Sequence, residues 1–144
     1  MATRLQMKLG VLADQELHPD SPDTVLVVEP TVGSRARSKG QLYLLVSSMV
    51  PGPRAREATR LVADVIRHEY YYDESAGIRV CLIKAILAAN KRLTHARERS
   101  ALVGAAGEAG GGAPIGIAVA VVRDRELYVA TVGPAEAYLI RQAR

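Results

Sequence analysis

The sequence predicts an α+β domain in which an antiparallel sheet carries an antiparallel pair of helices. Short runs rich in valine, isoleucine and leucine lie in the first and last thirds of the chain, and such runs are typical of strands. Two long segments between them repeat apolar residues at steps of three and four, the period of an amphipathic helix. Grouped strands and grouped helices indicate the α+β class. Because 144 residues with 49% hydrophobic side chains suit one core, we expect a single domain over 1–144.

Two strands are expected near the beginning of the chain. The run TVLVV at 24–28 is dominated by β-branched residues and is closed by Glu29-Pro30, where proline cannot extend a ladder. The nearly continuous apolar run at 42–46 is typical of a strand buried on both faces. Between them, the basic stretch at 31–40 is predicted to be a turn. Its cationic side chains are either solvated or bind an acidic or phosphorylated partner; they are Arg35, Arg37 and Lys39.

Two helices are expected in the middle of the chain. Pro53 suits the first turn of a helix, which should end near 70–73. Its last turn contains Tyr70-Tyr71-Tyr72, which either forms an interaction patch or packs in part against the next helix. A second helical period follows over 78–93. After it, the glycine- and alanine-rich segment at about 103–113 is predicted to be a flexible loop, because glycine loses the most backbone entropy on ordering.

A meander of three strands is predicted in the last third of the chain. Its apolar runs lie at 115–122, 127–132 and 137–141, and they are separated by the charged turn at 123–126 and by Gly133-Pro134. The expected order is therefore two strands, two helices and three strands.

Composition and charge narrow the classes of function. The formal charge is +4, but acidic residues are interspersed with basic ones, and phenylalanine and tryptophan are absent, so no nucleic-acid partner is expected. The single cysteine, Cys81, needs no oxidising compartment, and a cytoplasmic location is expected. No stretch approaches about 18 uninterrupted apolar residues, so no membrane contact is expected within the chain. The spacing of His18, His68 and His95 is not of the zinc-binding type.

Five short stretches, taken in order, resemble segments of a known family. They are Val46-Ser47-Ser48-Met49-Val50-Pro51-Gly52, Ala58-Thr59, Ala89-Asn90, Pro114-Ile115-Gly116 and Val132-Gly133-Pro134-Ala135-Glu136-Ala137-Tyr138. In this order and spacing the chain resembles the N-terminal part of the type 2C, metal-dependent (PPM) serine/threonine protein phosphatases. The resemblance implies a partial α-β-β-α sandwich of antiparallel sheets flanked by helix pairs, in a domain truncated at its C-terminal end.

The same resemblance implies a degenerate metal site. The family holds two divalent cations, Mg²⁺ or Mn²⁺, with carboxylates, and these cations activate a water against a phosphomonoester. Ser48 falls where the family has the aspartate that bridges both metals, and Pro134 falls in the family's G-D-S-R signature. Asp23 is the candidate remnant metal ligand, although an aspartate after proline is also typical of a solvated turn. No catalytic residue is assigned, and no cofactor is expected unless the domain is an active enzyme, which would use Mn²⁺ or Mg²⁺.

The sequence therefore predicts a phosphatase 2C-like pseudophosphatase that acts by protein binding in phospho-signalling. Its expected partner is a protein, such as a kinase or a phosphoprotein. Two alternatives stay open. One is an active, divergent metal-dependent serine/threonine phosphatase. The other is a structural or dimerising module, in which unpaired strand edges of two chains pair with each other to form a homodimer.

Overall fold

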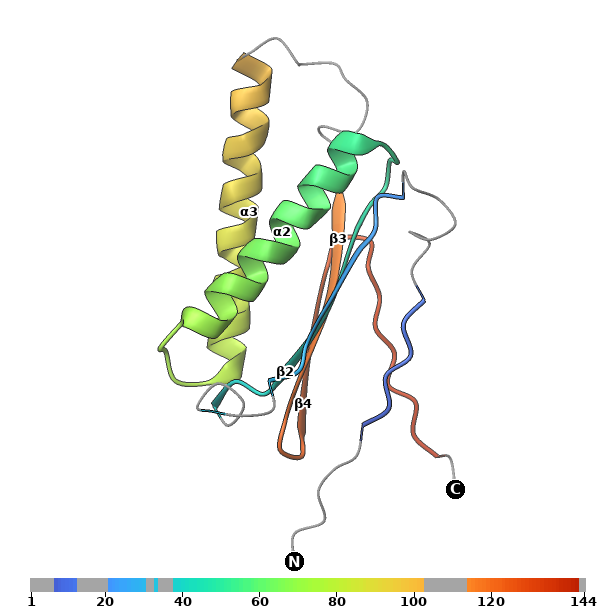
Figure 1. The fold of residues 1–144 in the computed structure, drawn as a ribbon, viewed down its shortest axis with the longest axis vertical. Helices are drawn as coiled ribbons and strands as arrows, with labels where there is room; N and C mark the ends of the chain where they lie inside the picture. The colour runs from blue at the N-terminus through green and yellow to red at the C-terminus, as the bar shows by residue number, and fades with distance from the viewer. Residues whose placement is uncertain (1–6, 13–20, 31–32, 34–37, 103–113, 143–144) are drawn as a thin grey trace, which may run out of the picture.

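A computed structural model of the protein describes residues 7–12, 21–30, 33, 38–102 and 114–142, excluding the side chains of residues 100–102. Within these ranges the chain forms one four-stranded antiparallel sheet, in the order β1-β2-β3-β4, and two long helices (Figure 1). The predicted α+β class is confirmed. The elements are β1 (Thr24–Val28), β2 (Gln41–Ser48), α2 (Pro53–Tyr72), α3 (Ile78–Leu102), β3 (Ile115–Arg123) and β4 (Glu126–Val132).

The helix pair is inserted between the two central strands of the sheet. β2 and β3 are hydrogen-bonded neighbours along their whole lengths, with Leu42 opposite Val121 and Ser48 opposite Ile115, although α2 and α3 separate them in the chain. The other two connections lie between sequential neighbours, since β1 pairs with β2 and β3 pairs with β4. The two ends of the helical insertion therefore return to the same end of the sheet.

Both helices cover one face of the sheet, and the core lies between them and that face (Figure 1). Helix α2 packs across β1 and β2, and α3 packs beside α2 and touches β4. The sheet contributes alternate residues because successive strand side chains point to opposite faces. The fully or nearly fully buried sheet residues of the core are Leu42, Leu44, Val46, Ile117, Val119 and Val121. The helices contribute Val62, Ile66, Tyr70, Leu82, Ala85 and Ala89, among others.

The three consecutive tyrosines at the end of α2 have different environments. The Tyr70 hydroxyl is buried and donates to the carbonyl oxygen of Lys39 at 2.5 Å, and the Tyr71 hydroxyl donates to that of Gly40 at 3.0 Å. Tyr72 is 61% exposed, and its ring stacks on His68. Two of the three tyrosines thus tie the end of α2 to the backbone that leads into β2, and one stays on the surface.

The third strand predicted for the last part of the chain, at 137–141, is wrong. β4 ends in a turn at Gly133, whose φ of 64° favours glycine, and residues 135–142 belong to no strand. Their apolar pattern resembles that of a strand, but a strand needs a neighbouring backbone, and no described strand offers one to this segment. Tyr138, Leu139 and Ile140 are therefore 80%, 67% and 90% exposed.

Two further expectations concern the rest of the chain. The segment at about 103–113, predicted to be a flexible loop, lies outside the described residues. Within the described ranges, neither helix is long and apolar enough to cross a membrane.

Candidate functional site: the open face of the sheet and its Asp23 end

The face of the sheet opposite the helices is apolar. Each strand presents alternate residues to it, since the other alternate residues fill the core. None of the residues on this face is aspartate, glutamate, lysine, arginine or histidine. They are Val25 and Val27 from β1, Gln41, Tyr43, Leu45 and Ser47 from β2, Gly116, Ala118, Ala120 and Val122 from β3, and Leu127, Val129 and Thr131 from β4. We call this set the open face.

The open face has small residues along its centre and larger ones on both sides. The central strand β3 contributes Ala118 and Ala120, and Ala120 lies between Tyr43 on β2 and Val129 on β4. Val129 and Leu127 are each 49% exposed, and on the other flank Leu45 is 42% and Val27 is 38% exposed. An antiparallel sheet with one solvated face normally shows polar residues there. This face instead has the composition of a sheet surface that packs against a second layer.

The chain itself begins to cross the open face after β4. A Cβ atom added to Gly116 would lie 3.1 Å from the backbone nitrogen of Ala135 and 3.3 Å from Cγ of Pro134. Gly116 therefore lets the backbone after β4 pass closely over β3. In Figure 1 the described segment 134–142 continues on the side of the sheet opposite the helices. This segment has the exposed side chains of Tyr138, Leu139 and Ile140.

Asp23 lies at one end of the open face. It immediately precedes β1, and its carboxylate oxygen Oδ1 accepts a hydrogen bond from the Ser47 hydroxyl at 2.5 Å. Ser47 is the residue of β2 on the same face and at the same level. The candidate metal ligand is therefore paired across two strands with a neutral hydroxyl, at the sheet end where the resemblance implies metal-binding carboxylates.

Ser48, which the resemblance aligns with the bridging aspartate, does not share this face. It is 8% exposed, its alternation matches the core residues of β2, and its Oγ accepts a weak hydrogen bond from Val50 N at 3.3 Å. Sequence alignment alone could not separate Ser47 from Ser48, because a shift of one residue reverses the face of every strand side chain. The position facing Asp23 is that of Ser47.

The resemblance aligns Ala58-Thr59 on α2 with the family's A-S pair. Thr59 contacts the same end of the sheet, on the face that is packed against the helices. Thr59, on α2, has no exposed surface. Its hydroxyl lies 2.9 Å from that of Thr24 and donates to the carbonyl oxygen of Arg56 at 3.0 Å. Since the Thr59 proton is used in that second bond, Thr24 is the donor of the first. In the A-N pair on α3, Ala89 is buried in the core and Asn90 is exposed.

The other end of the open face contains its one ionisable group. The Tyr43 hydroxyl lies 2.7 Å from Oε1 of Glu29 and 3.1 Å from Oε1 of Gln41. Burial, the hydrogen bond to Glu29 and the negative charge of Glu29 together raise the pKa of Tyr43. The phenol therefore stays neutral at physiological pH, and the face has no charge between Asp23 and Glu29.

Among the described residues, no group of three or more histidine, cysteine, aspartate or glutamate side chains is arranged to hold a metal ion. Of the three histidines, His18 lies outside the described residues, while His68 and His95 are exposed on separate helices. The segment that the resemblance aligns with the family's G-D-S-R signature places no carboxylate on the sheet either. Pro134 and Ala135 cross over Gly116, and Glu136 follows in the extended segment, where it accepts a hydrogen bond from Tyr138.

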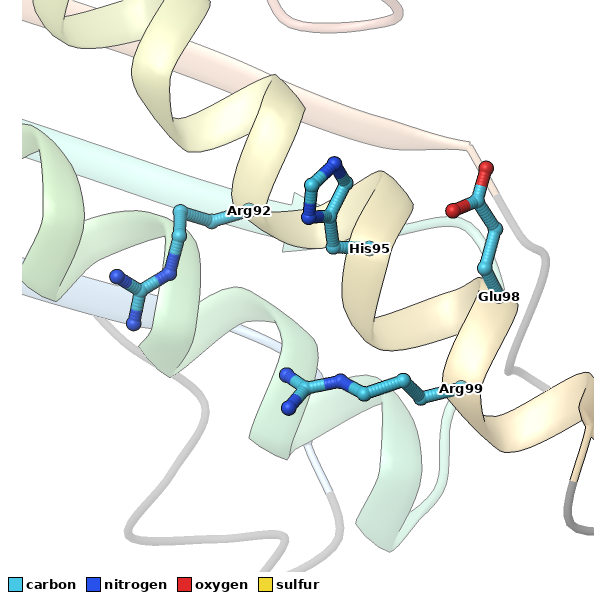
Figure 2. Close-up of a pocket in the computed structure, with 4 residues that line it drawn as sticks. All are labelled: Arg92, His95, Glu98 and Arg99. Atoms are coloured by element: carbon cyan, nitrogen blue, oxygen red, sulfur yellow. The ribbon is translucent and has the colours of Figure 1, made fainter.

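A shallow, positively charged hollow of about 300 Å³ lies on α3 (Figure 2). It is lined by Arg92, His95, Glu98 and Arg99, and all four are exposed. In Figure 2 the two arginines extend to the side of α3 that faces α2, and His95 and Glu98 lie on another side. Exposed side chains with this spacing are typical of a solvated helix surface, so the hollow has no buried polar group that would define a ligand.

Lys39, in the basic stretch before β2, is buried against a cysteine. Lys39, expected either in a solvated turn or in contact with an acidic partner, is only 8% exposed, and its ammonium group lies 2.9 Å from the sulfur of Cys81. Arg35 and Arg37 lie outside the described residues. Nothing in the spacing of Lys39 and Cys81, which are 42 positions apart, indicated that they meet.

Comparison with protein-family models, with curated proteins and with solved structures returned no match for this chain.

Proposed function

We propose that this chain is a non-catalytic domain of phosphatase 2C-like architecture that works by binding another protein through the open face of its sheet. The observation that carries the proposal is the uncharged, aliphatic composition of that face, with helices on the opposite side only. A contiguous apolar surface of this kind marks an interaction site in a soluble protein. Covering the half-exposed Leu127, Val129, Leu45 and Val27 would contribute about 1 kcal/mol each, roughly half of the value for a fully exposed aliphatic side chain.

The proposed occupant is a second antiparallel sheet that presents an equally uncharged apolar face. Two sheets pack face to face about 10 Å apart, with their side chains interleaved. The small residues Ala118 and Ala120, between larger flanking residues, leave room for side chains of such a layer. Pro134 and Ala135 pass over Gly116, so the backbone after β4 already lies against this side of the sheet. With helices outside both sheets, the result would be the α-β-β-α sandwich of the phosphatase 2C family.

The non-catalytic part of the proposal follows from the sheet end at Asp23. Mg²⁺ and Mn²⁺ need several oxygen ligands, and negative charge offsets the cost of removing their water. Asp23 faces the Ser47 hydroxyl across the strands, and a neutral hydroxyl cannot bridge two cations as a carboxylate does. We therefore infer that Mn²⁺ and Mg²⁺ play no part in the domain's action. The partner would be a kinase or a phosphoprotein of the same signalling system, as the resemblance implies.

A phosphatase assay tests the non-catalytic part. We expect no hydrolysis of p-nitrophenyl phosphate above the buffer blank in the presence of excess Mn²⁺. Hydrolysis that Asp23→Ala removes, while the control Asp124→Ala leaves it intact, would establish the alternative, an active divergent serine/threonine phosphatase. Asp124 is suitable as a control because it lies in the β3–β4 turn, at the opposite end of the sheet.

The open face also favours a second candidate function, a homodimerising module. Two copies facing each other through this surface would complete the four-layer sandwich without a different partner. Sedimentation equilibrium distinguishes the two, because the homodimer dissociates on dilution and the heteromeric binder is monomeric throughout.

A charged substitution on the open face tests both candidates together. Val129→Lys is expected to abolish the dimer if one forms, or to reduce the fluorescence of a bound hydrophobic dye if the chain is monomeric. Leu87→Lys is the matched control, because Leu87 is 62% exposed on α3, away from the sheet. A monomer whose dye binding is unchanged by Val129→Lys would refute the open face as the binding surface.

A further inference from the structure

A second site lies at the base of the helix pair, on the helix side of the sheet and apart from the open face. A cavity of about 480 Å³ is bounded by the backbone leading into β2, the end of α2 and the start of α3. Lys39 and Cys81 both line it, and Cys81 is only 1% exposed. Sγ of Cys81 also lies 3.4 Å from the carbonyl oxygen of Ser75. Cys81 is the single cysteine of the chain.

The amino group of Lys39 is unusually placed for a lysine. Lysines are almost never buried unless a carboxylate pairs with them, because an unpaired buried charge is costly. Among the described residues the contacts of Lys39 Nζ are the sulfur of Cys81, at 2.9 Å, and the ring of Tyr70, 5.3 Å from its centroid. An ammonium group has three donors, and a thiol sulfur is a weak acceptor. A lysine nitrogen is thus held against the one nucleophilic sulfur, with its hydrogen-bonding capacity incompletely used.

The carboxylate of Asp73 does not take the place of the sulfur. The Asp73 carboxylate lies at the end of α2 and lines the same cavity. Its Oδ1 accepts a hydrogen bond from Ser75 N at 2.8 Å and lies 4.0 Å from Lys84 Nζ, while its Oδ2 is buried with no hydrogen-bond partner in the described part of the chain. Asp73 therefore contributes negative potential near Lys39 and leaves the contact between nitrogen and sulfur intact.

We propose that Cys81 and Lys39 form a peroxide-responsive cross-linking site, in which a reversible sulfur–nitrogen bond joins the start of α3 to the turn that leads into β2. In the first step the thiol attacks hydrogen peroxide, the O–O bond breaks, and a sulfenic acid and one water form. In the second step the Lys39 nitrogen attacks the sulfenic sulfur, the S–O bond breaks, and a second water and one proton leave. Sulfur is oxidised by two electrons and peroxide is reduced to water.

The geometry favours the second step over further oxidation. A sulfenic acid condenses with a thiol or with a backbone nitrogen. Here an amine nitrogen is already in contact with the sulfur, and the chain has no second thiol. Because Cys81 lines the cavity, a molecule as small as peroxide has a route to its sulfur. The bond would close a loop across the helix α2 and restrict the unfolded chain, as a disulfide does.

Intact-mass spectrometry of the whole chain after treatment with hydrogen peroxide is the test. We expect a species two hydrogen atoms lighter than the untreated protein, reversed by dithiothreitol, and a higher urea midpoint before reversal. Tryptic digestion should miss the cleavage after Lys39 and yield a linked peptide pair that contains Cys81. Oxidation of the three methionines adds oxygen without loss of hydrogen, so it is distinguishable by mass.

Two variants and a trapping reagent complete the test. Cys81→Ser and Lys39→Arg should both lose the lighter species, and the peptide map of the wild-type chain decides the result if either variant fails to fold. Dimedone, which captures sulfenic acids, should label Cys81 and suppress the cross-link. An unchanged mass after peroxide would overturn the proposal, and so would a Cys81 that only gains oxygen. Labelling of Cys81 by dimedone would also overturn it if no linked peptide formed when dimedone was left out.

Discussion

Removing the hydroxyl of Tyr70 should destabilise the domain more than removing that of either neighbouring tyrosine. The Tyr70 side chain has no exposed surface, and its hydroxyl donates to the carbonyl oxygen of Lys39 at 2.5 Å. Tyr70→Phe leaves that carbonyl oxygen without this donor in a buried place, which costs about 1–3 kcal/mol. Tyr71→Phe breaks a longer, partly exposed bond to Gly40, with an expected cost of about 0.5–1.5 kcal/mol.

Tyr72→Phe completes the series as the matched control. Tyr72 is 61% exposed, and a surface substitution of this kind changes the free energy of unfolding by no more than about 0.5 kcal/mol. Burial raises the pKa of Tyr70, and it raises the pKa of Tyr71 to about 12. Both hydroxyls are therefore protonated donors throughout an assay at neutral pH.

Urea unfolding followed by circular dichroism measures the series. For an m-value of about 2 kcal/mol per molar urea, a loss of about 2 kcal/mol lowers the midpoint by about 1 M. The expected order of midpoints is wild type and Tyr72→Phe highest, then Tyr71→Phe, then Tyr70→Phe. If Tyr70→Phe unfolded at the wild-type midpoint, the end of α2 would not be anchored to the backbone before β2 through this hydroxyl, and the reasoning from its hydrogen bond would be refuted.

Three further predictions concern the turn before β2, the cavity and the sheet end. Gly40→Ala should destabilise the domain strongly, because a Cβ there would lie 2.3 Å from the Val122 carbonyl oxygen at a φ of 71°. Gly77→Ala is also at positive φ but in open space, so it should cost only about 1–2 kcal/mol of backbone strain. Equal urea midpoints for the two variants would contradict this. Hydrogen bonds from Ser75 lower the pKa of Asp73, so its stabilising contribution is present above the unfolded value of 3.8 and is lost as the pH falls through the lower folded value. Asp73→Asn should therefore be less stable than wild type at pH 7, with a difference that narrows below about pH 4, and a difference independent of pH would oppose this assignment. Ser47→Asp should place two carboxylates in contact with each other and lower the melting temperature at pH 7 by an amount that added Mn²⁺ partly restores; an Mn²⁺ response from Ser48→Asp instead would show that Ser48 is the residue facing Asp23.

The periodic elements could be predicted from the sequence because their signals are local. The run TVLVV lies at β1 as expected, and the helical period that begins with Pro53 ends at Tyr72, inside the range predicted for it. The charged turn between β3 and β4 was equally clear, with Asp124 at a φ of 55°. In each case the residues of a helix end, a strand or a hairpin are enough to predict the element.

The segment at 137–141 shows where local signals fail. Its alternation of alanine, tyrosine, leucine and isoleucine is typical of a strand, yet a strand exists only where another backbone supplies hydrogen bonds. Whether such a pairing forms is decided by the whole fold, and in the described chain these residues belong to no strand. The exposed Tyr138, Leu139 and Ile140 are the consequence.

The sequence by itself determined the α+β class of this protein, because the periodic runs that mark its strands and helices are local signals. Only the tertiary structure decided that Ser47, and not Ser48, faces Asp23, because the register of β1 against β2 fixes which alternate residues share a face. Only the tertiary structure brought Lys39 to Cys81 and left one face of the sheet apolar and open. Those contacts join residues far apart in the chain, and no spacing along the sequence encodes them.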